Sequence, residues 1–302
     1  MDLIESVRMA LRSLRANKLR AGLTMLGIII GTGAVIALLA VGQGAQAEIT
    51  SQIQSIGSNL IFVFPGQLQQ GMGRGTLRIV RMLTRQDAEA IADTSRNPHV
   101  AAVAPEVQRS VTLAYGGDSV YITAVGTTPE YEFVRNFPAQ YGEFFTAADE
   151  AAAARVVVLG AQPAKNLFGD PEEAVGQTVR INGVPFKVIG VLVEKGGQGF
   201  GGGSRDAIVV LPLSTMQKKL FSGRMLAEGG LRVDFINVSA VDEASIDAAI
   251  EEITWTLRDR HEIQYEEDDF TVASQQDILS VAGQITNILT IVLGAIAGIS
   301  LL

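Results

Sequence analysis

The sequence predicts an α+β membrane protein in which two transmembrane helices flank an extracytoplasmic domain. Two long apolar runs without charge lie near the ends of the chain, at residues 21–42 and 278–302. Between them, residues 43–277 alternate between the periodicities of strands and helices. The mean hydropathy of +0.26 is high for a soluble protein and low for one that lies mostly in lipid, which fits such a mixed architecture.

Residues 21–42 predict the first transmembrane helix. No charged residue occurs from Ala21 to Ala47, and a helix needs about 20 apolar residues to cross a bilayer. A cleaved signal peptide is the alternative, because residues 45–47 (AQA) resemble a cleavage site. The apolar region of a signal peptide spans roughly 7–15 residues, and this run is longer. Residues 278–302 predict the start of a second transmembrane helix.

The distribution of basic residues predicts the orientation. Five of them precede the first run, the next one after it is Arg74, and none lies between His261 and Asp277. Because cytoplasmic flanks are enriched in Lys and Arg, we expect a cytoplasmic N-terminus and an extracytoplasmic 43–277. The five basic residues are Arg8, Arg12, Arg15, Lys18 and Arg20.

Residues 1–20 predict a cytoplasmic amphipathic helix. Ile4, Val7, Leu11 and Leu14 recur three and four residues apart and form one apolar stripe, with the basic side chains elsewhere. Such helices usually lie in the lipid headgroup layer. The segment either serves only as a topology signal or also contacts a cytoplasmic partner.

Each apolar run carries two glycines four residues apart. These are Gly27 and Gly31 in the first run and Gly294 and Gly298 in the second. Glycines at this spacing allow two membrane helices to approach closely, so the four are candidates for helix packing.

Composition excludes several classes of function. The net charge is −8, and residues 1–42 carry +3 while 278–302 carry none, so 43–277 holds −11. Because phosphate binding needs a basic face, we expect no nucleic-acid partner. The chain has no cysteine, which excludes disulfides, thiolate metal sites and thiol nucleophiles.

The middle of the chain predicts two β-α-β units with an insertion. Thr84 and Asp87 resemble a helix-capping start, and Asn182-Gly183 between β-branched runs is a strong hairpin signal. We therefore expect two halves at about 43–129 and 229–277, with a β-rich insertion at about 130–228. Strands are expected at 59–65, 99–104, 119–125, 155–160, 179–193 (as a hairpin), 207–213, 231–238 and 270–273, and a second helix at 243–257.

No catalytic or cofactor motif is found. The phosphate-binding pattern GxxxxGK[ST] does not occur, so the chain is predicted to be no enzyme and to bind no cofactor or metal. The glycine-rich run at 196–203 is interpreted as a loop, in which Phe200 is a possible partner contact. His99 and His261 have no ligand-like spacing and are assigned solvated or capping roles.

Aromatic residues concentrate in the segment 131–145 (YEFVRNFPAQYGEFF). The first interpretation is a packing cluster that locks one subdomain onto another. The alternative is a surface for an apolar substrate or partner.

Several segments together resemble one family of transporter subunits. They include ESVRMALRSLRANKLRAGLTMLGIIIGTGAVIALLAVGQGA (5–45), GSNLIFVFPG (57–66) and RVVVLGAQPAKNLFGD (155–170). VGQTVRINGVPFKVIGVLVEKG (175–196) and VVLPLSTMQKKLF (209–221) follow in the same order. The chain thus resembles the MacB-type ABC transporter permeases of the FtsX/LolC superfamily, truncated within the second transmembrane helix.

The resemblance implies a membrane-spanning subunit in the bacterial inner membrane, with a porter-like α/β part and a β-rich insertion in its periplasmic or extracellular domain. Expected partners are a separate cytoplasmic ABC ATPase that binds the ATP, a second copy of the chain, the lipid bilayer, and a periplasmic adaptor with an outer-membrane channel. The expected function is export by mechanotransmission. The alternatives are an FtsX-like regulator of an extracytoplasmic partner such as a cell-wall hydrolase, and a membrane-anchored binding module.

Overall fold

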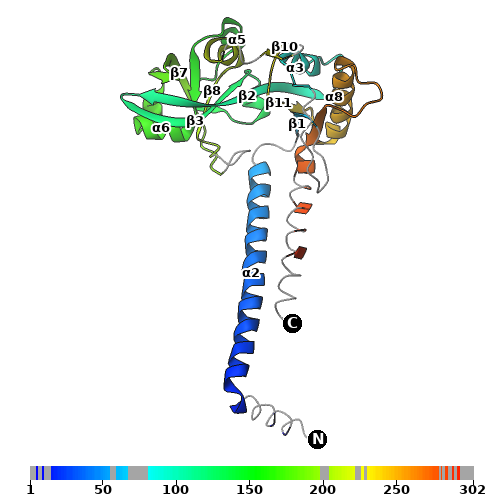
Figure 1. Cartoon of the computed structure of the whole chain (residues 1–302). Coiled ribbons are helices and arrows are strands. Elements are labelled where there is room, and N and C mark those ends of the chain that lie inside the picture. Colours follow the sequence, from blue (N-terminus) through cyan, green and yellow to red (C-terminus); the bar gives the residue numbers. More distant parts are fainter. Residues whose placement is uncertain are drawn as a thin grey trace. The chain divides into compact units, whose positions relative to one another are not determined.

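The computed structural model describes residues 5, 9, 15–54, 59–66, 81–197, 204–221, 226–227, 230–278, 280, 283–284, 288 and 291–292. The chain divides into two compact units. The first contains residues 1–51 and 279–302, and the second contains residues 52–278. Figure 1 shows the whole chain with its elements labelled.

In the first unit, helix α2 (Lys18–Gln54) covers the first predicted span. Large apolar side chains are exposed along it, including Leu23, Ile29 and Ile36. Among the described residues, no helix combines the length and the apolarity that crossing a membrane requires. The transmembrane assignments of 21–42 and 278–302 stay predictions.

The second unit is built on one mixed sheet with the order β12-β1-β11-β2-β3-β8-β5-β7-β4, and β6 pairs with β2 and β7. The described strands are β1 (Leu60–Pro65), β2 (Val100–Tyr115), β3 (Asp118–Thr127), β4 (Ala139–Gly142), β5 (Val156–Leu159), β6 (Thr178–Ile181), β7 (Val184–Leu192), β8 (Ile208–Pro212), β9 (Leu226–Ala227), β10 (Gly230–Leu231), β11 (Phe235–Ala240) and β12 (Phe270–Ser274). β9 and β10 form a separate two-stranded ribbon.

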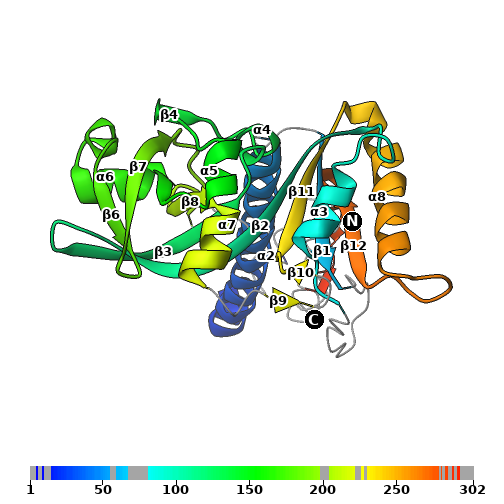
Figure 2. The same cartoon turned by 90° about the horizontal axis from the view of Figure 1, so that it is seen from above.

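Short helices cover this sheet. They are α3 (Arg85–Ile91), α4 (Tyr131–Val134), α5 (Ala147–Ala152), α6 (Ala161–Phe168), α7 (Leu213–Thr215) and α8 (Ile246–Arg260), with the 3₁₀-helices η1 (Pro171–Ala174) and η3 (Glu243–Ser245) and the π-helix η2 (Met216–Leu220). Figure 2 shows α3 and α8 at one end of the unit and α6 at the other, with β2 and β3 running between them.

Strand β2 is shared between two groups of strands. Its residues 100–106 pair with β11, and residues 107–115 pair with β3. The partner therefore changes between Glu106 and Val107. One group is β12-β1-β11 with the first half of β2. The other is the second half of β2 with β3 to β8, and β3 pairs in parallel with β8.

Both faces of the sheet are buried. Side chains on a strand alternate between the two faces, and in β1, Ile61 and Val63 join one hydrophobic cluster while Leu60 and Phe62 join the other. Tyr131, Phe137 and Phe145 of the aromatic segment belong to the second cluster, which contains residues from both groups of strands. These three aromatic side chains are therefore packed in the core, and the division into subdomains stays a prediction.

Two local predictions are confirmed in detail. Thr84 and Asp87 form a capping box at the start of α3. Asn182 and Gly183 connect β6 to β7 with φ of 48° and 82°, the left-handed backbone that a type I′ hairpin turn requires.

The predicted domain boundaries stay a prediction, but the strand pairing shows how the segments are joined. Residues 118–127, assigned to the first half, form β3 and pair with β8 from the predicted insertion. Residues 231–238 were expected to form one strand. Instead, Gly230–Leu231 forms β10, and β11 begins at Phe235.

The predicted solvated or capping roles fit both histidines, and each also contacts an acidic side chain: the side chain of His99 is 45% exposed, and His261 is the C-cap of α8. His99 Nδ1 lies 2.5 Å from Glu252 Oε1. His261 caps α8, as predicted, but its side chain is buried, with Nδ1 2.6 Å from Asp269 Oδ1 and Nε2 3.5 Å from Asp87 Oδ2. The spacing in the sequence did not reveal these three acids, because Glu252 and Asp87 are more than 150 residues from the histidines they contact and Asp269 belongs to the acidic run at 266–269.

Asp87 and His261 join α3, α8 and the segment before β12. Asp87 also accepts a hydrogen bond of 2.8 Å from Arg260 Nε. Burial opposes the charge on Asp87, yet the nearby His261 and hydrogen bonds from Arg260 and Thr84 hold its pKa well below its usual range. Burial likewise opposes the charge on His261, but the hydrogen bond to Asp269 and the nearby charge of Asp87 raise its pKa to about 9.

This ion network predicts a loss of stability in mild alkali. Because the folded-state pKa of His261 lies above 6.5, its contribution is fully present below pH 6.5 and disappears as the pH rises through about 9. We expect the free energy of unfolding to fall by roughly 3 kcal/mol across this window, from the size of the pKa shift. Urea unfolding between pH 6 and 9.5, followed by the fluorescence of the single tryptophan, Trp255 on α8, measures it.

His261→Gln removes this pH dependence, and His99→Gln is the matched control that keeps it. An unfolding free energy of the unsubstituted chain that stays constant from pH 6 to 9.5 would contradict the assignment.

Candidate functional site

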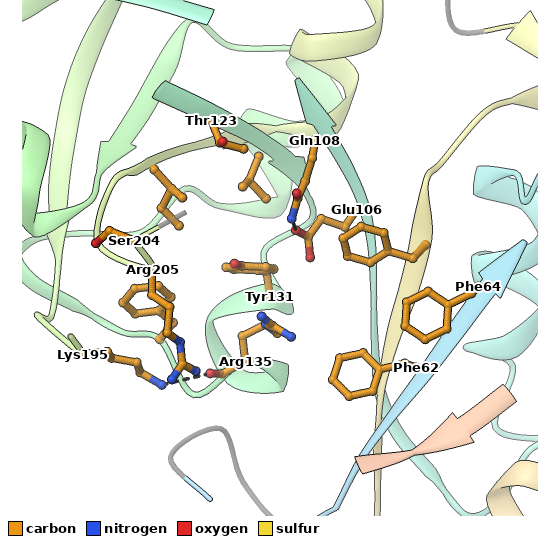
Figure 3. A pocket seen from close by; sticks show the side chains of 14 residues that line it. Phe62, Phe64, Glu106, Gln108, Thr123, Tyr131, Arg135, Lys195, Ser204 and Arg205 are labelled. Carbon is orange, nitrogen blue, oxygen red and sulfur yellow. Dashed lines mark hydrogen bonds between the residues drawn. The ribbon is translucent and has the colours of Figure 1, made fainter. Parts of the chain in front are cut away.

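A cavity of about 340 Å³ lies within residues 52–278, where the two groups of strands meet. Its walls come from β1, β2, β3, α4, β8 and β11 and from the segments beside Phe137 and Lys195. Four phenylalanines, three basic residues and one carboxylate line it. Figure 3 shows Lys195 and Arg205 together at one side, Phe62 and Phe64 across from them, and Tyr131 between.

The carboxylate is Glu106, the last residue of β2 that pairs with β11. Its side chain is buried, at 1% exposure, in a strand that is otherwise mostly apolar. Gln108 Nε2 donates to Glu106 Oε1 at 2.7 Å, and Asn237 Nδ2 donates to Oε2 at 2.7 Å. Burial raises the pKa of Glu106, while the positive charge of Arg135 and these two hydrogen bonds oppose the rise.

Arg135 follows helix α4 and lies over an aromatic ring. Its Cζ atom is 5.9 Å from the centroid of Phe62, within the range of a cation–π contact. Tyr131, on this helix, has a pKa that is raised by burial and by the charge of Glu106. Arg135 thus connects the aromatic segment to β1.

Lys195 and Arg205 come from the chain on either side of residues 198–203. Lys195 Nζ donates to the Arg135 carbonyl oxygen at 3.2 Å and lies 5.1 Å from the centroid of Phe137. The carboxylate of Asp206 accepts from the backbone N–H groups of Lys195 and Gly196 at 2.9 and 2.8 Å. This carboxylate holds the two ends of the segment together and so brings both cations to the cavity.

Two of these cations, Lys195 and Arg205, have a lowered pKa. Burial and the charges of Arg205 and Arg135 lower the pKa of Lys195 to about 8, against the opposing charge of Asp206. Burial and Arg135 also lower the pKa of Arg205. Like charges brought together in a half-buried site disfavour one another's ionised form, so this side of the cavity favours an added negative charge.

Comparison with known proteins gives a consistent result along the chain. The model of the MacB-like periplasmic core domain family matches residues 21–254. The chain belongs to this family. It is 39% identical to the macrolide export ATP-binding/permease protein MacB of Azoarcus sp., over all of this chain and 43% of that protein. It is 31% identical to the pyoverdine export ATP-binding/permease protein PvdT of Pseudomonas putida, with the same two shares covered.

The fold of this MacB-like chain also matches a solved structure. The crystal structure of the periplasmic region of MacB from Actinobacillus actinomycetemcomitans superposes with a TM-score of 0.60 and 26% identity. The match covers 77% of this chain and 96% of that one. The chain spans less than half the length of the two export proteins.

Of the helix-packing and contact residues predicted from the sequence of this MacB-like chain, Gly27 and Gly31 are described, and neither lines the cavity. Gly27 is exposed, with no atom within 4 Å of a side chain built there, and Gly31 is buried. Gly294, Gly298 and Phe200 lie outside the described residues, so the packing and contact assignments stay predictions. Within the part of the chain that the structure describes, no group of three His, Asp or Glu side chains could hold a metal ion.

Sequence reasoning found two lining residues of the cavity and missed the charged ones. Tyr131 and Phe137 belong to the aromatic segment that was noted. Glu106 had a weak signal, because a lone carboxylate follows a run of apolar residues at 100–105. The cations had none, since they are separated in sequence and are assembled only by the fold.

The charge cluster predicts an unusual titration for Lys195. With [¹³C]-dimethylated lysines, the NMR signal of Lys195 should titrate with a midpoint near pH 8. Arg205→Gln removes a repelling charge, so the midpoint should rise. Arg96→Gln removes an arginine that pairs with Asp259 outside the cavity and should leave it in place. An unchanged midpoint in Arg205→Gln would show that the two cations do not interact.

Proposed function

We propose that this chain is the permease part of a MacB-like ABC exporter, which transmits an ATP-driven conformational change to its periplasmic domain and so expels a substrate. The observation that carries this proposal is the family match over residues 21–254, together with identity to export proteins along the whole chain. Because these relatives are named as exporters, they favour export over an FtsX-like regulatory role.

The chain sits in the bacterial inner membrane through α2 and residues 278–302, with its N-terminus in the cytoplasm. The exposed apolar side chains of α2 support this placement, because outside lipid they would face water. The basic residues before α2 support the orientation. The match to a MacB-like periplasmic core domain supports a periplasmic location for this domain.

ATP is bound outside these residues, on an ATPase partner subunit, and the chain itself is no enzyme. The lack of a phosphate-binding loop in the sequence supports this division. The two relatives are named as single proteins that combine ATP binding and permease. A second copy of the chain, a periplasmic adaptor and an outer-membrane channel complete the proposed assembly.

Transmission requires that the periplasmic domain move as packed elements with discrete arrangements. Two features of the second unit support this role. Its sheet is continuous from β12 to β4, and β12 ends at Ser274, immediately before residues 278–302. A shift of those residues would therefore be delivered to an edge strand of the sheet.

The placement predicts a clear labelling pattern in intact cells. The chain contains no cysteine, so a single one can be introduced. Tyr265→Cys, at a side chain that is 96% exposed, should react with a membrane-impermeant maleimide added to cells whose outer membrane alone has been permeabilised. Glu5→Cys should react only after the inner membrane is also opened. The reverse pattern, or equal labelling of both, would contradict the proposed topology and with it the permease assignment.

A further inference from the structure

The cavity between the two groups of strands has the size of a small-molecule site. Its volume of about 340 Å³ is more than twice that of an apolar cavity of about 150 Å³ that holds benzene. It also falls near the lower end of the range for ligand pockets. A bicyclic aromatic group or a short acyl chain is thus the size of apolar body that it accepts.

The apolar walls are aromatic and come from both groups of strands. Phe62 and Phe64 lie on β1 and Phe235 on β11, while Phe137 follows α4. Phe62 and Phe64 have ring centroids 5.9 Å apart and Phe64 and Phe235 6.2 Å apart. These rings form one continuous apolar surface against which a flat or acyl group would be buried.

The polar end of the cavity is positively charged. Arg135, Lys195 and Arg205 line it, and Glu106 is the carboxylate among the described lining residues. Glu106 accepts from the amides of Gln108 and Asn237, and Asp206 accepts from two backbone N–H groups. The described lining residues thus carry more positive than negative charge, although residues 43–277 as a whole are acidic.

We propose that this cavity binds a small apolar molecule with a single anionic group, the anion held by Arg135, Lys195 and Arg205 and the apolar body packed against Phe62, Phe64 and Phe235. The anion relieves the mutual repulsion of the cations. A cationic ligand of the same shape is disfavoured by the same charges. Binding needs neither ATP nor a partner, so a test of this site is independent of the test of the export proposal.

Such a ligand bridges the two groups of strands. On one side it contacts β1 and β11, and on the other it contacts residues that follow α4 and flank β8. The ligand therefore stabilises one arrangement of the two groups, and its affinity depends on that arrangement.

Equilibrium dialysis of the full 302-residue chain in a neutral detergent tests the site. The detergent concentration is the same on both sides of the dialysis membrane. Three probes share one apolar body: 2-naphthoate, 2-naphthamide and 2-naphthylmethylamine. We expect 2-naphthoate to bind at one site at least about tenfold more tightly than the amide, as one charge-assisted hydrogen bond implies. The amine should bind most weakly.

Variants locate the binding. Arg135→Gln and Lys195→Gln should each weaken 2-naphthoate by about tenfold and leave the weak binding of 2-naphthamide unchanged, which also shows that the variants fold. Arg135→Lys, which keeps the charge, should retain most of the affinity. Arg96→Gln and Lys187→Gln, the same changes at cations outside the cavity, are the matched controls and should bind as the unsubstituted chain does.

Competition with dodecanoate separates two sources of the ligand. Displacement of 2-naphthoate by dodecanoate indicates an acyl carboxylate of membrane origin, and failure to displace it indicates a compact water-soluble anion. Equal affinity for 2-naphthoate and 2-naphthamide, or undiminished affinity in both Arg135→Gln and Lys195→Gln, would overturn the proposal.

Discussion

The structure of residues 52–278 depends on a single change of partner within strand β2. Up to Glu106 this strand pairs with β11, and from Val107 onward it pairs with β3. The strand β2 thus belongs to both groups of strands. Where its partner changes, backbone N–H and C=O groups need hydrogen bonds from groups outside the strand pairing. Asp234 supplies one, since its carboxylate accepts from the backbone N–H of Gln108 at 2.8 Å. Thr127 supplies another by donating to the Pro105 carbonyl oxygen at 2.9 Å.

The cavity is a consequence of this arrangement. Where β2 changes partner, β11 and β3 lie on opposite sides of it and leave space that the side chains of β1, α4 and β8 only partly fill. Glu106 lies at this point and remains buried because Gln108 and Asn237 satisfy its oxygens. A buried carboxylate and a set of mutually repelling cations cost stability, and such groups with shifted pKa values concentrate at functional sites. The ligand proposal rests on the volume, the aromatic walls and the three cations of this cavity, and the export proposal rests on the family match.

Local features of this fold could be predicted from the sequence, and features that depend on distant segments could not. The hairpin at Asn182-Gly183 and the capping box of Thr84 and Asp87 were found because each is decided within a few residues. The length of β2 was missed beyond residue 104, because Pro105 normally marks an edge or the end of a strand. Here β2 continues through Pro105, whose carbonyl oxygen accepts a hydrogen bond of 2.9 Å from the Thr127 hydroxyl. The short helix α6 was missed because it spans only two turns.

The same limit applies to the site. The high aromatic content of residues 131–145 could be recognised in the sequence. Whether these side chains pack in the core or bind a ligand depends on which other segments contact them in the fold. Arg135, Lys195 and Arg205 come together only because α4 packs on β2 and β11 and because Asp206 holds the segment after β7 to the one before β8. The spacing of these three residues in the sequence does not predict that they lie close together.

The central claim is that β2 makes the two groups of strands one cooperative unit. Native-state hydrogen exchange of the full chain at increasing denaturant tests it most directly. The strands β1 and β5 lie in different groups. We predict that, at increasing denaturant, their amides exchange through the same unfolding reaction as the amides of Val107 and Gln108. The free energy of opening and its dependence on denaturant should then be the same for all of these amides. Separate openings for β1 and β5, with either group remaining protected while the other exchanges, would contradict the account.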